Sequence, residues 1–154
     1  MTFEPTLDMS ARYPVPADIV WAALTKHRFT SEWWHSLDFP KRVGVRVQVQ
    51  TPRPLKKRPR AAVGRVKRLD PGEMIQATLR SEPRGFKSEL TITVTQLSQK
   101  TRVRIVEDGI PYDDDSTVVM KECRDGWREF LGALGDYLDD NKTVTRIRRH
   151  LDDA

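Results

Sequence analysis

The segment STVVMKECRDGWREFLGALGDYLD, residues 116–139, carries apolar side chains at steps of three and four residues. This spacing places them on one face of an α-helix. Three glycines weaken the helix propensity of the segment, so we expect its apolar face to be held by packing against another layer. The face consists of Val119, Cys123, Trp127, Phe130, Leu131, Leu134 and Leu138.

The layer that this helix would cover is predicted from segments with a two-residue period. In VGVRVQVQ, residues 43–50, four valines alternate with glycine, arginine and glutamine, which is typical of a strand with one buried face. Asp70-Pro71-Gly72 predicts a tight turn between two further strands. We expect strands at residues 6–13, 43–50, 61–69, 73–81, 90–95 and 101–107, a bulge at Gly64, and short helices at 17–26 and 30–36.

Strands that follow one another through short turns pair antiparallel, and one amphipathic helix is available to cover them. This order predicts an α+β fold in which a curved, six-stranded antiparallel sheet wraps one long C-terminal helix. A length of 154 residues fits one domain. We expect this domain at residues 1–140, followed by a charged and partly disordered tail at 141–154.

Composition permits a reducing compartment. The only cysteine is Cys123, so an intramolecular disulfide is excluded. No apolar run approaches the ~18 residues that a membrane span requires. Residues 1–10 also lack the basic and apolar regions of a signal peptide, and we therefore expect a cytoplasmic protein.

The net charge of +5 is unevenly distributed, because residues 39–69 contain no acidic side chain. This predicted hairpin, residues 41–68, could bind an acidic partner or an anionic ligand. No aromatic residue is interleaved between Val43 and Leu69, so the stacking platforms of single-strand nucleic-acid binding are missing. A solvated charged hairpin is the alternative. The densest basic cluster is Arg53, Lys56, Lys57, Arg58 and Arg60.

Residues that could carry metal or nucleophilic chemistry are sparse. The histidines are His27, His35 and His150, and no two of them are spaced for a shared metal ion. Cys123 lies on the apolar helix face, where a thiol usually acts as a small hydrophobe. We therefore predict no metal, no cofactor and no assigned catalytic residue. His35 as an acid or base at the mouth of a cavity remains an alternative.

Several segments together resemble one superfamily. They are Val15 to Thr25 (VPADIVWAALT), Trp33-Trp34, Gly64-Arg65-Val66, Thr91 to Val94 (TITV) and Gly126-Trp127. In this order they are similar to the polyketide-cyclase and START-like superfamily, also called SRPBCC, and most similar to the branch that contains the activator of a heat-shock chaperone ATPase. The resemblance covers roughly residues 7–140 and implies the helix-grip fold.

The resemblance also implies a hydrophobic ligand held in a cavity between the sheet and the long helix. The function we expect is therefore binding or carrying of an apolar small molecule. Two alternatives remain: a cyclase or dehydratase in which His35 or Tyr112 supplies a proton, and an interaction module that uses the basic hairpin. The ligand-binding residues that we predict are Trp33, Trp34, Phe86, Ile92, Val103, Val119, Cys123, Trp127 and Phe130.

Overall fold

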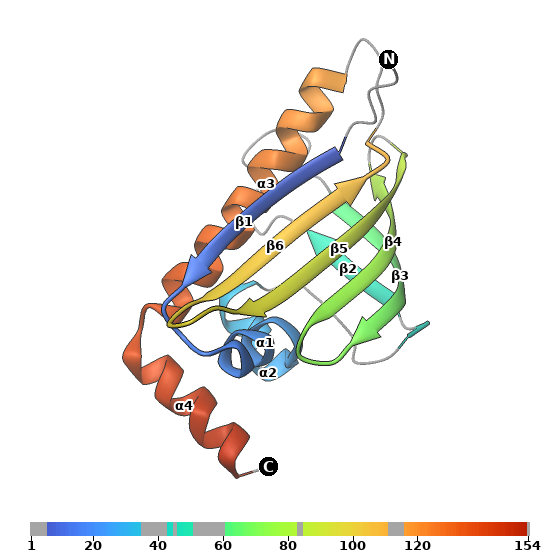
Figure 1. Ribbon diagram of the computed structural model, residues 1–154. Helices are drawn as coiled ribbons and strands as arrows, with labels where there is room; N and C mark the ends of the chain where they lie inside the picture. The colour runs from blue at the N-terminus through green and yellow to red at the C-terminus, as the bar shows by residue number, and fades with distance from the viewer. Residues whose placement is uncertain are drawn as a thin grey trace.

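The computed structural model describes residues 6–34, 43–44, 46–50, 61–82, 85–110 and 116–153. Within these ranges the chain forms six strands and four helices (Figure 1). In chain order they are β1 (Thr6–Tyr13), α1 (Ala17–Thr25), α2 (His27–Trp33), β2 (Arg46–Gln50), β3 (Ala61–Asp70), β4 (Met74–Glu82), β5 (Lys87–Gln96), β6 (Thr101–Asp108), α3 (Ser116–Leu138) and α4 (Asn141–Asp152).

All six strands belong to one sheet with the order β1-β6-β5-β4-β3-β2, and every neighbouring pair is antiparallel. Strands β2 to β6 follow one another as a meander. β1 crosses over to pair with β6, with Thr6 opposite Asp108 and Tyr13 opposite Thr101. The fold is the α+β helix-grip architecture that the sequence predicts.

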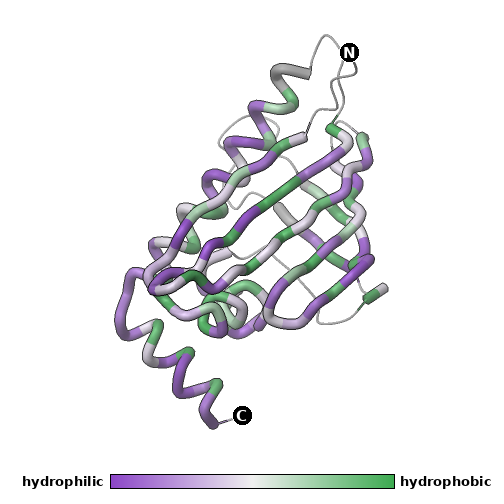
Figure 2. Tube along the Cα trace, viewed as in Figure 1, coloured by the Kyte–Doolittle hydropathy of each residue, from purple (hydrophilic) through white to green (hydrophobic). Residues whose placement is uncertain are grey.

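The inner face of the sheet is built by alternation along the central strands. In β5 and β6, nearly every second side chain is buried and its neighbours are more exposed. Ile92 lies opposite Ile105, and Val94 lies opposite Val103, so each strand contributes to the same apolar layer. Figure 2 shows hydrophobic and hydrophilic residues alternating along the strands. The two-residue period of the sequence therefore sets which face packs on the helices.

Helix α3 lies alongside β1 and turns its apolar face toward the core (Figure 1). Tyr13 of β1 ties the two together, because its hydroxyl donates a hydrogen bond of 2.7 Å to the carbonyl oxygen of Leu131. A Cβ at Gly135 would lie 3.3 Å from the Tyr13 ring, so this glycine lets the ring approach the helix. All seven residues of the predicted stripe are buried: Val119, Cys123, Trp127, Phe130, Leu131, Leu134 and Leu138.

Two local predictions are wrong. The helix expected at residues 30–36 is present as α2, but its start is wrong: it begins at His27, because the carbonyl of Lys26 accepts the first helical hydrogen bonds. Residues 35–36 lie outside the described ranges. The bulge expected at Gly64 lies between Val66 and Arg68. Gly64 instead permits close strand approach, since a Cβ there would overlap the backbone oxygen of Thr78.

The C-terminal segment forms helix α4, so the expected disorder is wrong for residues 141–152. The Asp140 carboxylate caps the helix by accepting a hydrogen bond of 2.9 Å from the Lys142 backbone amide. Ile147 is fully buried. Arg148 forms an ion pair of 2.7 Å with Asp18 of α1. Apolar contact and charge pairing together dock α4 on the N-terminal helices.

Candidate functional site

An aromatic cluster lies where the end of α2 meets the middle of α3. Its centre is Phe130, whose ring centroid is 5.2 Å from those of Trp33, Trp34 and Trp127. Phe130 is fully buried, Trp34 is 1 % exposed and Trp127 is 3 % exposed. The rings meet edge to face, the arrangement that aromatic quadrupoles favour. These four residues therefore form one compact aromatic cluster in the hydrophobic core.

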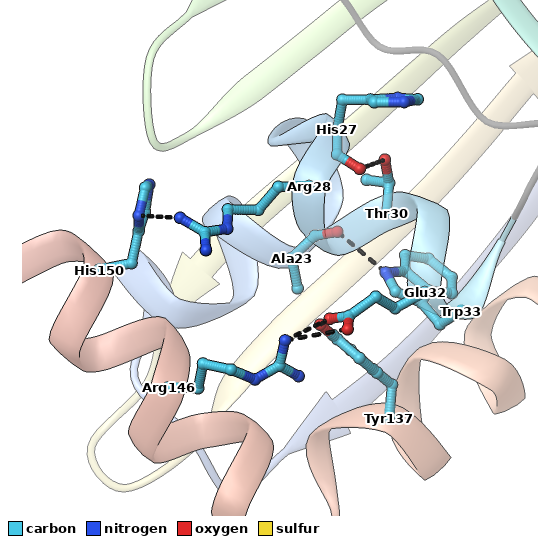
Figure 3. A network of polar contacts seen from close by, with 9 residues as sticks. All are labelled: Ala23, His27, Arg28, Thr30, Glu32, Trp33, Tyr137, Arg146 and His150. Atoms are coloured by element: carbon cyan, nitrogen blue, oxygen red, sulfur yellow. Dashed lines mark hydrogen bonds and ion pairs between the residues drawn. The ribbon is translucent and has the colours of Figure 1, made fainter.

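Local structure explains why these four rings meet. Trp127 and Phe130 are three residues apart on α3 and so lie on one helix face. Trp33 is the last residue of α2, and its indole N–H donates a hydrogen bond of 3.0 Å to the carbonyl oxygen of Ala23 in α1 (Figure 3). This bond fixes the end of α2 against α1 and thereby places Trp33 and Trp34 on α3.

A carboxylate is buried beside this cluster. Glu107, on β6, is 0 % exposed. Its Oε1 accepts a hydrogen bond of 2.9 Å from the indole N–H of Trp127, and its Oε2 accepts one of 2.6 Å from the Ser88 hydroxyl. A buried carboxylate is costly unless it is hydrogen-bonded. Glu107 thus supplies a polar group at the interface of sheet and helix.

Sequence reasoning did not single out Glu107, although a signal was present. Val103, Ile105 and Glu107 alternate along β6, and all three are buried on the same face. The two-residue period therefore assigned Glu107 to the inner face. An ionisable side chain at that position is nevertheless expected to face solvent, because glutamate is rarely fully buried without a partner.

A second polar group in the cluster is a hydrogen-bond donor. The indole Nε1 of Trp34 is buried and has no acceptor within the described part of the chain. The neighbouring Trp33 differs, because its indole N–H is satisfied by Ala23. Leaving a buried donor unpaired costs about 1–3 kcal/mol. The cluster therefore presents an unused N–H on a ring that packs against Phe130, as the Glu107-bound Trp127 does.

The remaining predicted ligand residues lie on the same two layers. Ile92 and Val103 are fully buried on β5 and β6, and Val119 and Cys123 are buried on α3. Phe86 is partly buried and lies just before β5. Their role in binding a ligand stays a prediction. The following predicted residues lie outside the described ranges: His35, Tyr112, Arg53, Lys56, Lys57, Arg58 and Arg60.

The strands of the basic hairpin are described, although its loop is not. β2 and β3 pair antiparallel from Arg46 opposite Arg65 onward. Two of its cations already have acidic neighbours: Lys67 lies 3.0 Å from Glu89, and Arg68 lies 3.2 Å from Asp70. Binding of an acidic partner through this hairpin stays a prediction.

A polar network at the surface end of α3 holds α2 and α4 together (Figure 3). The Glu32 carboxylate accepts hydrogen bonds from the Tyr137 hydroxyl at 2.6 Å and from Arg146 at 2.8 and 2.9 Å. The hydrogen bond from Tyr137, with the charge of Arg146, lowers the pKa of Glu32 below 4.5. Burial and the Glu32 charge raise the pKa of Tyr137. Because Glu32 directly precedes Trp33, the network also fixes the aromatic cluster.

A hollow of about 620 Å³ opens on the sheet over β3, β4 and β5. None of the nine predicted ligand residues lines it. Arg80, Lys87 and Asp108 give it an exposed, charged rim. It shares no ring with the aromatic cluster, although Ser88, which lines it, also donates to Glu107.

Two negative findings hold for the described residues. They contain no group of three or more histidine, cysteine or acidic side chains that could hold a metal ion. Among the helices built from them, none combines the length and the apolar character needed to cross a membrane.

Comparison with known proteins gives a family and a fold. The family model for activator of Hsp90 ATPase homolog 1-like protein matches residues 14–139. No match is found among curated protein sequences. The protein MLL2253 from Mesorhizobium loti has a similar structure, with a TM-score of 0.71, 22% identity, and 88% of this chain and 97% of that one covered.

Two further structures are similar. DynU16, a protein of the dynemicin biosynthetic locus, has a TM-score of 0.73 and 19% identity over 90% of this chain. The chain covers 49% of DynU16, about half its length. A START superfamily protein from Mycobacterium smegmatis has a TM-score of 0.64 and 12% identity, and 87% of this chain and 97% of that one are covered. At these identities the likeness establishes the SRPBCC/START-like fold.

Proposed function

Because this chain belongs to the family of activator of Hsp90 ATPase homolog 1-like proteins, we propose that it binds an apolar small molecule between the sheet and α3. Its SRPBCC/START-like fold is one that commonly binds hydrophobic ligands. The ligand would contact the nine residues predicted from the sequence. Chaperone activation is not part of the proposal.

The observation that carries this proposal is the aromatic cluster around Phe130. Three tryptophan rings surround it at 5.2 Å: Trp33 ends α2, Trp34 follows it, and Trp127 lies on α3. Ligand pockets for apolar molecules are lined mainly by aromatic and aliphatic side chains with a few placed polar groups. Glu107 and the Trp34 N–H are such polar groups. A small displacement of α2 relative to α3 would open this cluster to a ligand.

The test uses N-phenyl-1-naphthylamine, a neutral probe whose fluorescence rises in apolar surroundings. We expect saturable binding with quenching of tryptophan emission. Phe130→Leu keeps an apolar side chain at the centre of the cluster but removes the ring, so it should weaken the probe's affinity.

The matched control is Val63→Thr, which changes an exposed side chain lining the surface hollow and should leave probe affinity unchanged. Absence of saturable binding would contradict the proposal. So would a loss of affinity in the Val63 variant with none in the Phe130 variant, because the probe would then occupy the hollow.

A second candidate function is a cyclase- or dehydratase-type reaction in the same place. The observation that favours it is Glu107, because a buried carboxylate is a group that enzymes use as a general acid or base. Glu107→Gln retains an acceptor for Trp127 and can reverse the bond to Ser88. We expect an enzyme to lose turnover in this variant while keeping probe affinity. Loss of water from a bound β-hydroxy thioester, followed by mass spectrometry, would measure that turnover.

A further inference from the structure

Two adjacent tryptophans of the cluster differ in one respect. The Trp33 N–H is bonded to the Ala23 carbonyl at 3.0 Å, whereas the Trp34 N–H has no acceptor among the described residues. Both rings contact Phe130 at the same centroid distance of 5.2 Å. Trp34 is the more deeply buried of the two, at 1 % exposure. The cluster thus contains one satisfied donor and one unsatisfied donor, both on rings that pack against Phe130.

A buried donor without a partner should favour ligands that carry a hydrogen-bond acceptor. An N–H that has already lost its water gains a full hydrogen bond when an acceptor arrives, and it costs stability when none does. An apolar ligand without an acceptor would leave the Trp34 N–H unpaired. A ligand with a carbonyl oxygen at that point would pair it without any new desolvation of the protein.

The burial of the cluster and of the neighbouring Glu107 adds a second constraint. The Glu107 carboxylate is bonded to Trp127, and Trp127 contacts Phe130, which contacts Trp34. An anion brought into this dry region would lose its hydration, and the four rings of the cluster offer no cation to pair with it. Fatty acids and other carboxylates are therefore disfavoured relative to neutral molecules of the same shape.

We propose that the ligand is a neutral, ring-containing carbonyl compound, such as an aryl ketone or quinone, whose oxygen accepts the hydrogen bond of the Trp34 indole. This inference rests on the proposed binding of an apolar molecule and specifies the chemical class of that molecule. Trp34 is then the residue that determines specificity, and the dry aromatic surroundings disfavour acids.

The test compares three naphthalenes of similar size by equilibrium dialysis at neutral pH: 2-acetylnaphthalene, 2-ethylnaphthalene and 2-naphthoate. They carry, in that order, a neutral acceptor, no acceptor and an anion. We expect 2-acetylnaphthalene to bind about tenfold more tightly than 2-ethylnaphthalene, the equivalent of one hydrogen bond. We expect 2-naphthoate to bind most weakly.

Trp34→Phe removes the donor and keeps a ring against Phe130. In this variant the affinity for 2-acetylnaphthalene should fall to that of 2-ethylnaphthalene. Trp33→Phe is the matched control: it removes an N–H that is already paired, so it should lower stability and leave the affinity ratio unchanged. Glu107→Gln should leave the ratio of the two neutral probes unchanged, because it does not alter the Trp34 donor.

The outcomes separate this inference from the function on which it rests. Equal binding of the ketone and the hydrocarbon would overturn the inference and leave apolar binding intact. A ratio that survives Trp34→Phe would also overturn it. If none of the three probes binds, the proposed function fails and the inference fails with it.

Discussion

Two glutamates accept hydrogen bonds from aromatic side chains of α3, one in the interior and one at the surface. Glu107 accepts from Trp127 at 2.9 Å and is 0 % exposed. Glu32 accepts from Tyr137, ten residues further along α3, at 2.6 Å, and its side chain is 38% exposed. Similar bonds in different surroundings have different consequences. The interior carboxylate must be satisfied by its neighbours, whereas water can replace the neighbours of the surface carboxylate.

This difference gives the two pairs different expected roles: the interior pair would act in the site, and the surface pair would position its residues. The interior pair joins the sheet to the aromatic cluster where a ligand would lie. The surface pair joins α2, α3 and α4 through Arg146 and so holds Trp33 and Trp34 in place from outside. We therefore expect changes to the interior pair to have large effects on stability and binding. Changes to the surface pair should have small ones.

The largest expected effect is that of Trp127→Ala. The variant loses a buried ring, its contact with Phe130 and its bond to Glu107, and it should be destabilised by ~3–5 kcal/mol, as large core truncations are. Urea unfolding measures the difference in the free energy of unfolding. Binding of an apolar probe should weaken as well. A folded variant that binds the probe unchanged would exclude Trp127 from the site.

The next effect is that of Glu107→Ala, which leaves the Trp127 N–H and the Ser88 hydroxyl without their shared acceptor. Two buried groups lose partners, so we expect a destabilisation of about 3 kcal/mol. Glu107→Gln preserves the shape and an acceptor, and it should cost much less in the same urea titration. Equal losses in the two variants would show that charge, rather than hydrogen bonding, holds the interior pair.

A smaller effect is expected for Arg146→Ala at the surface pair. Both partners are well exposed, so the loss should be at most about 1 kcal/mol. Addition of salt should slightly lower the free energy of unfolding of the wild type. The difference in this free energy between wild type and variant should therefore become smaller. A loss of stability as large as that of Glu107→Ala would mean that the surface pair and the interior pair contribute equally to stability, which would contradict the expected difference between them.

The smallest effect is a dependence on pH. The pKa of Glu32 is lowered in the folded protein by Tyr137 and Arg146, so its contribution to stability is present above about pH 4.5 and is lost as the pH falls further. In Tyr137→Phe this acid-side loss should be reduced, because the first of the two groups that lower the pKa is removed. Urea titrations at pH 7 and at acidic pH in the two proteins check this. An unchanged pH dependence would exclude Tyr137 as a cause.

The parts of the fold that could be predicted from the sequence are those governed by short-range periodicity. The stripe of α3 and the alternation of β5 and β6 are local patterns, and the structure buries the residues that they indicate. Helix α4 was not predicted, because the arginines of this segment made it resemble a charged, disordered tail. Its partners, Asp18 and Glu32, are distant in sequence, and only the fold brings them near.

The aromatic residues of the candidate site could be predicted from the sequence, but the hydrogen bonding of its polar groups could not. Trp33, Trp34, Trp127 and Phe130 were selected from composition, position and family resemblance, and the structure brings them together. Whether an indole N–H has an acceptor depends on tertiary contacts. The pairing of Trp33 with Ala23, and the absence of a pairing for Trp34 in the described chain, therefore required the structure.

The most direct test of ligand binding at this cluster is a titration followed through the indole N–H resonances of the four tryptophans by ¹H–¹⁵N NMR. Trp33, Trp34 and Trp127 lie in the cluster, and Trp21 of α1 serves as the reference. On addition of 2-acetylnaphthalene we expect the Trp34 and Trp127 resonances to move most, with Trp34 shifting downfield as its N–H gains an acceptor. Trp21 should stay nearly unmoved. Saturable binding that leaves Trp34 and Trp127 in place, or that moves Trp21 alone, would contradict the account.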